Sequence, residues 1–397
     1  MSERHHLPEE ILIEILTRLP VRSLVRFTAV SKSWFFLITS PAFVSAHLRH
    51  SRCNDDHSVG NHLLIRHLEN SSIKEKYEIL EETDHQTLNP ISSPELPPAF
   101  ACEDIRVVGC YSGVVCLSDA WYCDLCCTYL WNPCIQKLKP LSPPTIIRPA
   151  GSLNALLGFG VNPECDGDLK VVRAVYQRKG EYLQMPDGPP DVEIYLLSTG
   201  KWRTISAVGV NLYMIDFDLW WSQTFVHGAV HWIGRKWVDN VRSKCCITVF
   251  SMADEVFSEI MLPNKLAKWI ALYLHIMMFD ESIAVAKYAT RNHCIFCDLW
   301  VMKEYGVVES WCRIYRIELF GWMDRIVGFR KNGDILICSE NRELVSYCPT
   351  TKFFHKLGIY GTNRSFFVGK YLESLVLLQE KSCEVDVLFK EMTSVSI

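Results

Sequence analysis

Cysteine and histidine are the residues in this sequence whose types and spacing could do chemistry. Two Cys-x-x-Cys pairs occur, Cys123/Cys126 and Cys294/Cys297, and His293 precedes the second pair. Two such pairs close together bind Zn²⁺, and one pair can act as a redox dithiol. The pairs are about 170 residues apart, far more than paired zinc knuckles allow. The spacing therefore argues against a shared zinc site and leaves a surface redox pair among Cys123, Cys126 and Cys127 open.

The remaining candidates for catalysis are isolated. His227 and His231 are four residues apart, but Gly228 lies between them in a β-hairpin pattern, and no glutamate follows the first histidine as a zincin requires. The glycines of Gly158-Phe159-Gly160 do not open a helix that could bind a phosphate, so we interpret them as hairpin glycines. No G-x-S-x-G elbow is present. We predict no catalytic residue, no metal site and no cofactor.

Composition is that of a soluble globular protein of 397 residues, with 49% apolar and 22% charged residues. The formal net charge of -4 and the scattered Lys and Arg residues give no basic field for nucleic acid. The longest apolar run, Trp269–Phe279, is about half a membrane span, and no signal peptide is evident. The 17 cysteines then indicate small buried side chains in a reducing compartment. We expect a cytoplasmic or nuclear protein that binds neither nucleic acid nor membrane.

The most regular apolar pattern in the chain predicts a first helix. Leu7, Ile11, Ile15 and Leu19 recur at steps of four, with Leu12 and Leu16 beside them. Pro8 suits the first helical turn, and the acidic pair that follows interacts favourably with the helix dipole. Pro20 cannot continue the helix, so we expect it to run from about Pro8 to Leu19.

Three further short helices are expected at 21–30, 31–39 and from Pro41 onward, where Ser40 is the cap and Phe43, Val44 and Leu48 form the inner side. A polar hinge is predicted at 50–60. Four helices in about forty residues make a thin core, and chains this short rarely bury enough apolar surface alone. We expect another protein to complete this core, since the following strands offer no helical face to cover it.

Helical periodicity largely disappears from about Ile105 onward, where short strands and turns repeat. Two apolar residues and an aromatic, then a polar turn and another bulky residue, recur five times, and the leading aromatics are Trp131, Tyr195, Phe250, Trp300 and Tyr347. They are separated by 64, 55, 50 and 47 residues. A period near fifty with a four-strand unit is typical of kelch-like propeller blades. We predict a β-propeller-like domain.

A propeller must close its ring, because isolated blades leave apolar faces uncovered. Two strands are expected within 62–80 and a proline-rich connection at 89–98. We expect the strand-like segments 366–368, 374–378 and 385–389 to pair with or pack against the early strands at 63–80. A chain that ends near Lys370 should then unfold unlike the full chain.

The helical stretch resembles the F-box, the motif that binds the Skp adaptor of cullin-RING (SCF) ubiquitin ligases. The resemblance rests on Leu7-Pro8, Leu19-Pro20, Ser23-Leu24 with Arg26, and Val30-Ser31-Lys32-Ser33-Trp34. It implies that the chain binds the adaptor and, through it, the cullin and RING subunits. The implied adaptor-binding surface, together with the apolar stripe, comprises Leu7, Pro8, Ile11, Ile15, Leu16, Leu19, Pro20, Leu24, Val30, Lys32 and Trp34.

The strand region resembles the F-box-associated domain of plant F-box proteins. The similar phrases are GCYSGVVCL with LWNP, GFGVNP, VEIYLLSTGKWR, HGAVHW and LWVMKEYGVVESW, and the last is familiar from S-locus F-box and S-locus-F-box-like receptors. Cys134 and Val161 depart from the usual pattern. The resemblance implies a non-catalytic receptor that holds a target protein for ubiquitination and proteasomal degradation. The target could be S-ribonuclease-like or immune-related; a propeller enzyme or small-molecule sensor with a helical cap is the alternative.

The predicted fold class is α+β multidomain, with a small all-α F-box module at 1–50, a linker and first strands at 51–100, and a large all-β propeller-like domain at 101–397. An inserted loop rich in charge, Gly and Pro at 177–191 supplies the candidate target contacts Arg178, Lys179, Glu181 and Tyr182. A second set of aromatic residues would either form a recognition surface or fill blade cores: Tyr213, Trp220, Trp221, Trp237, Trp269 and Trp322.

Overall fold

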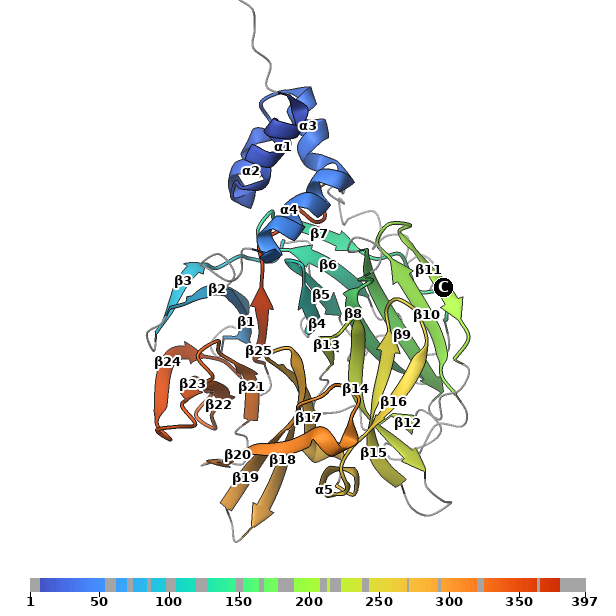
Figure 1. Ribbon diagram of the computed structural model, residues 1–397, viewed down its shortest axis with the longest axis vertical. Helices are drawn as coiled ribbons and strands as arrows, with labels where there is room; N and C mark the ends of the chain where they lie inside the picture. Colours follow the sequence, from blue (N-terminus) through green and yellow to red (C-terminus); the bar gives the residue numbers. More distant parts are fainter. Residues whose placement is uncertain are drawn as a thin grey trace, which may run out of the picture.

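The computed structural model describes residues 8–53, 62–69, 74–83, 87–97, 105–118, 127–147, 153–163, 168–177, 189–207, 213–214, 223–237, 243–269, 271–291, 294–319, 325–362 and 365–378. These residues form a group of helices followed by six β-sheets that surround a common centre (Figure 1). The predicted fold class is confirmed, and the β domain is a propeller of six blades.

Four helices make up the helical module: α1 Glu9–Thr17, α2 Val21–Phe27, α3 Lys32–Thr39 and α4 Pro41–Cys53. Ser31 and Ser40 cap α3 and α4, because their hydroxyl oxygens accept hydrogen bonds from backbone N–H groups of the first turn at 3.2 Å. The predicted order of helices is confirmed, although α2 ends three residues early. The hinge predicted from His50 is wrong for 50–53, since α4 continues to Cys53 and the Arg52 guanidinium donates to Ser112 Oγ at 2.6 Å.

Blades 1 to 3 are antiparallel sheets of four strands each. Blade 1 contains β25 Phe367–Tyr371, β1 His62–Leu68, β2 Glu75–Glu82 and β3 Leu88–Ser92. Blade 2 contains β4 Arg106–Tyr111, β5 Val114–Ser118, β6 Thr128–Asn132 and β7 Lys137–Pro140. Blade 3 contains β8 Leu153–Val161, β9 Leu169–Gln177, β10 Asp191–Leu196 and β11 Lys201–Ile205.

Blades 4 to 6 continue the ring. Blade 4 contains β12 Tyr213–Met214, β13 Thr224–Val226, β14 Ala229–Trp237, β15 Ser243–Ser251 and β16 Phe257–Met261. After the short helix α5 Asn264–Ala267, blade 5 contains β17 Leu274–Phe279, β18 Ser282–Arg291, β19 Cys294–Met302 and β20 Trp311–Leu319. Blade 6 contains β21 Arg325–Phe329, β22 Ile335–Cys338, β23 Glu343–Tyr347 and β24 Phe354–Tyr360.

The ring closes through blade 1, where the last described strand pairs with the first. β25 runs antiparallel to β1, with Val368 opposite Ile65 and Tyr371 opposite His62. Closure by the segment 366–368 is therefore confirmed. The segment 374–378 is not a strand beside 63–80; it turns away and packs against the helical module and blade 2. The segment 385–389 lies outside the described residues.

The five repeating aromatics all lie on the third strand of a blade and are buried: Trp131, Tyr195, Phe250, Trp300 and Tyr347. Blade 1 has no counterpart, because its third strand, β2, ends in the sequence ILEE. Blade 1 therefore leaves no trace in the aromatic period, although the strands predicted within 62–80 are confirmed as β1 and β2.

Part of the connection predicted at 89–98 is also a strand. Asn89 and Pro90 lie in β3, at the outer edge of blade 1, where Pro90 is opposite Leu80 at a β-bulge. An edge strand tolerates proline because the N–H that proline lacks has no neighbouring strand to bond. The connection predicted at 89–98 is therefore wrong for residues 89–92, which belong to β3.

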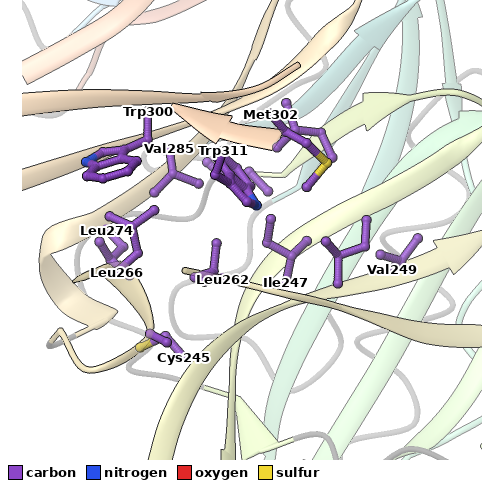
Figure 2. Packing of buried hydrophobic residues seen from close by; sticks show 14 of the residues in the cluster. Cys245, Ile247, Val249, Leu262, Leu266, Leu274, Val285, Trp300, Met302 and Trp311 are labelled. Atoms are coloured by element: carbon purple, nitrogen blue, oxygen red, sulfur yellow. The ribbon is translucent and has the colours of Figure 1, made fainter. Parts of the chain in front are cut away.

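Apolar side chains fill the spaces between blades. Between blades 4 and 5, Figure 2 shows Val285 and Trp311 on one side, facing Ile247 and Leu262 on the other. These side chains are at most 7% exposed. Each fully buried aliphatic side chain contributes about 1.5–3 kcal/mol, so this cluster strongly holds the two sheets together.

Candidate protein-binding surface on the helical module

The inner side of the helical module is a closed apolar core. Leu16, Leu24, Ile38 and Phe43 are at most 2% exposed, and Leu375 from the C-terminal segment is buried among them. Two predicted contact residues, Leu16 and Leu24, are thus core residues in this structure and cannot touch a partner directly. The expectation that only another protein completes this core is also corrected, because the chain's own Leu375 contributes to it.

The outer side of α1 carries the rest of the predicted stripe. Ile11 is 44% exposed and Ile15 is 47% exposed, and both line a shallow open hollow with Glu14, Arg18 and Leu19. Arg18 donates to Glu14 at 2.6 Å across this hollow, an exposed pair that adds little stability. Half-exposed isoleucines bordered by charges form the kind of surface that another protein covers.

A second apolar area lies at the start of α3. Val30 is 63% exposed, Phe35 46% and Phe36 68%. Trp34, by contrast, turns inward and packs edge-to-face on Phe27, with ring centroids 5.3 Å apart. Phe35 and Phe36 were missing from the predicted set, although the burial of Trp34 and Ile38, four residues apart, would place them on the outer side. Among the other predicted residues, Pro8, Pro20 and Lys32 are exposed, Leu19 is half-buried, and Leu7 is outside the described residues.

The module is fixed to the propeller through polar contacts of the C-terminal segment. Asn132, at the end of β6, donates from Nδ2 to the carbonyl oxygens of Ser374 (2.9 Å) and Val376 (2.8 Å). Ser374 Oγ donates to the Ser112 carbonyl oxygen at 2.6 Å, and the Ser112 hydroxyl accepts from Arg52 of α4. In Figure 1 the helices stand beyond β6, β7 and the end of β25.

The candidates for catalysis or metal binding are not gathered into a site in the described part of the chain. Cys294 and Cys297 lie three residues apart on β19, and burial raises the pKa of the Cys297 thiol far above its ordinary value. Cys123, Cys126 and His293 lie outside the described residues. No group of three or more His, Cys, Asp or Glu residues that could hold a metal occurs among the residues described.

The predicted hairpin around His227 is present between β13 and β14, and His231 is fully buried on β14. Its Nδ1 bonds the Thr224 carbonyl oxygen and its Nε2 bonds Tyr305 Oη at 2.7 Å. Gly158 and Gly160 lie inside β8 and not in a turn. A Cβ at either position would come within 2.4 Å of the Trp232 or Phe225 ring, so close packing explains these glycines.

The predicted target contacts Arg178, Lys179, Glu181 and Tyr182 lie outside the described residues, as do Trp220, Trp221 and Trp322. Trp269 is half-buried, and its Nε1–H donates to the Tyr288 carbonyl oxygen at 3.1 Å. This aromatic residue therefore packs mainly against the blade. None of the helices in the described ranges is both long and apolar enough to cross a membrane.

Two known protein families match the sequence of this chain. The F-box-like family matches residues 5–48, and the F-box associated beta propeller domain family matches residues 67–378. The chain is 25% identical to F-box protein CPR1 of Arabidopsis thaliana over 94% of this chain and 89% of that protein. It is 26% identical to F-box/kelch-repeat protein At3g23880 of the same plant, over 80% and 81% of the two chains.

Among solved structures, an alpha-L-arabinanase of Penicillium chrysogenum has a TM-score of 0.36 at 13% identity, over 72% of this chain and 86% of its own. That likeness is too weak to inform function.

Proposed function

The chain belongs to the F-box proteins that carry an F-box associated beta propeller domain, and from this premise we propose that it is the substrate-recognition subunit of an SCF-type ubiquitin ligase. In this role the helical module binds a Skp-type adaptor, which connects the chain to the cullin and RING subunits. The propeller holds a target protein, and its ubiquitination leads to proteasomal degradation. Catalysis belongs to other subunits, so this chain contributes proximity alone.

The observation that carries this proposal is the pair of half-exposed isoleucines, Ile11 and Ile15, on an F-box-like module whose inner core is already closed. Apolar residues that remain at the surface after a core is complete favour contact with a second protein. Val30, Phe35 and Phe36 add a second exposed apolar area, in α3 and just before it.

The rigid junction supports the same role. Because Leu375 packs into the helical core while Asn132 and Ser112 hold its neighbours, the module and the propeller are joined by more than the linker at 54–61. A fixed orientation would hold a bound target at a constant distance from the adaptor, which raises its effective concentration at the ligase.

We also propose where the target binds and what kind of protein it is. We place its contacts on the loops between blade strands, including Arg178, Lys179, Glu181 and Tyr182, and an S-ribonuclease-like or immune-related protein in the cytoplasm or nucleus is the candidate suggested by the resemblance. Pull-down under proteasome inhibition would identify it. A target that accumulates when this chain is removed would support degradation; unchanged abundance would contradict it.

Adaptor binding is tested by replacing the exposed isoleucines. We expect the double variant Ile11→Asp/Ile15→Asp to bind a Skp-type adaptor at least about tenfold more weakly, because two charged groups would have to be buried at the interface. The measurement is co-purification followed by titration of the full chain. Leu16→Asp is less informative, since a charge in the module core would unfold the module itself.

Val256→Asp is the matched control, because Val256 is 55% exposed on the propeller, at the turn between β15 and β16. It should leave adaptor binding unchanged. Adaptor binding that survives the double variant, or that falls equally in the control, would rule out the proposed surface. Circular dichroism of both variants checks that the helices remain folded.

A further inference from the structure

A row of charged side chains crosses blade 5 on the side that faces α5. Lys287 on β18, Asp298 on β19 and Arg316 on β20 lie directly opposite one another. The Arg316 guanidinium donates to both oxygens of Asp298, at 2.6 Å from Nε and 2.9 Å from Nη2. Arg313 adds a longer contact from Nη1 to Asp298 Oδ1 at 3.4 Å. Asp298 is therefore fully satisfied within the sheet.

Aromatic rings fix the positions of the cations. The Lys287 ammonium lies 3.9 Å from the centroid of the Trp269 ring and donates to the Lys265 carbonyl oxygen at 3.2 Å. The Lys265 ammonium lies 6.0 Å from the Trp300 ring, and the Arg316 guanidinium lies 6.0 Å from the Phe296 ring. Such contacts hold a cation in place without neutralising it.

The cluster has more positive than negative charge. Lys265, Lys287, Arg313 and Arg316 contribute four positive charges, and Asp298 contributes one negative charge. Glu318 is exposed on the same side of β20, so the excess is still two positive charges when it is counted. The whole chain has a formal charge of -4, so this surface differs in sign from the protein that carries it.

Part of this charge is available to a partner. The side chains of Arg313 and Arg316 are 43% and 52% exposed, whereas Asp298 is only 10% exposed. Burial, and repulsion from Arg316, Lys265 and Arg313, hold the pKa of Lys287 below its ordinary value although Asp298 opposes the shift. Pairing with Asp298 explains the position of Arg316, but it does not explain why further cations lie nearby. These cations repel one another, and a bound anion would relieve the repulsion.

We infer that Lys265, Lys287, Arg313 and Arg316, the blade-5 cation cluster, form a docking site for an acidic segment of the target protein. This inference rests on the proposed function as a target receptor and names the chemistry of the partner. The cations lie on β18, β20 and α5. β18 and β20 are two strand spacings apart, about 10 Å, and about three residues of an extended acidic chain cover the same distance. The half-buried rings of Trp269 and Phe296 lie beside these charges.

The location fits a receptor. The blade-5 cation cluster lies beside α5, at the edge of the ring opposite the helical module (Figure 1). An acidic segment bound there would not compete with the adaptor for space. Complementary charge would also speed the encounter with the target, with an effect that falls as ionic strength rises.

The test uses the full chain and a fluorescent peptide of eight glutamates flanked by glycine, with a glutamine peptide of the same length for comparison. Fluorescence anisotropy at about 50 mM salt should show binding of the glutamate peptide only. Lys265→Glu/Arg313→Glu should weaken that binding at least about tenfold, because two attractive charges become repulsive. These positions are chosen because Arg316 holds the buried Asp298 and its replacement would disturb the sheet.

Lys201→Glu/Lys352→Glu is the matched control, since both lysines are exposed on other blades and the change in net charge is the same. It should bind the peptide within about twofold of the unaltered chain. Equal weakening in the control, or equal binding of the glutamine peptide, would overturn the inference. Adaptor binding by Lys265→Glu/Arg313→Glu should be unchanged. Failure of the unaltered chain to bind the glutamate peptide rejects the docking site alone, whereas failure of the unaltered chain to bind a Skp-type adaptor rejects the proposed function.

Discussion

His231 shows how the stability of the fold depends on the protonation state of one buried side chain. Its ring is fully buried, with Nδ1–H donating to the Thr224 carbonyl oxygen at 3.3 Å and Nε2 accepting from the Tyr305 hydroxyl. Burial, with some repulsion from His227, lowers the pKa of His231 to about 4 although backbone hydrogen bonds oppose the shift. The neutral ring suits both partners, whereas protonation would place an uncompensated positive charge in the buried site.

This arrangement predicts a stability that falls at acidic pH. The unfolded chain binds a proton at His231 near pH 6.5 and the folded chain only near pH 4, so the unfolded state gains protons first as pH falls. Between pH 7.5 and 5.5 the loss from His231 should be on the order of 1 kcal/mol. Urea unfolding at the two pH values measures it. His275, with its pKa lowered by burial to about 3, acts in the same direction.

The variant His231→Gln separates this contribution from the others. It should be less stable at pH 7.5 and should lose less stability on going to pH 5.5 than the unaltered chain. A pH dependence that is the same in the variant would contradict the assignment. Tyr305→Phe should destabilise the fold by about 1–3 kcal/mol at pH 7.5, because Nε2 of His231 would be buried without a donor.

At the scale of elements, the segment after β25 connects two parts of the fold, the helical module and the propeller. Leu375 is 1% exposed within the helical core, whereas Leu377, two residues later, is 5% exposed within the core between blades 2 and 3. The segment therefore presents one leucine to each side. The side-chain amide of Asn132 fixes its backbone between these two contacts.

Leu375→Ala should destabilise the helical module by about 2–5 kcal/mol, the usual effect of removing a buried leucine side chain. Hydrogen exchange should increase in α1 to α4 while the blades keep their protection. Leu377→Ala is the matched control, and it should increase exchange mainly in blades 2 and 3. If both variants change the same regions equally, the two leucines do not act on separate sides.

At the scale of the whole molecule, stability depends on closure of the ring. The inner strands of neighbouring blades contact one another around the centre, and β25 supplies the inner strand of blade 1. Arg66 strengthens the same junction. It pairs with Glu75 and donates to the carbonyl oxygens of Ile105, just before β4 of blade 2, and of Ser365, just before β25. The first and the last described strands thus take part in one sheet.

A chain that ends at Phe366 lacks β25 and should lose cooperative unfolding, because β1 would become an open edge at the centre of the ring. A chain that ends at Leu378 keeps every described strand and is the control. Calorimetry should show a lower and broader transition for the shorter chain alone. A transition like that of the full chain would contradict closure through β25.

The sequence by itself determined the elements whose signals are local. Serine caps and prolines marked the helices, and buried aromatics near a fifty-residue period marked the third strands of five blades. These features depend on neighbours within a few residues, so a linear pattern contains them. The candidate residues Ile11 and Ile15 were found in the same way, from helical spacing.

Only the tertiary structure decided which of these residues are available and how the ends meet. Val368 pairs with Ile65 across about three hundred residues. A contact between residues so far apart in the sequence forms a long loop and leaves no local pattern. Leu16 and Ile15 are adjacent in one stripe, yet the core takes the first and leaves the second at the surface. The blade-5 cation cluster likewise exists because pairing of three strands places Lys287, Asp298 and Arg316 side by side, which spacing along the chain does not reveal.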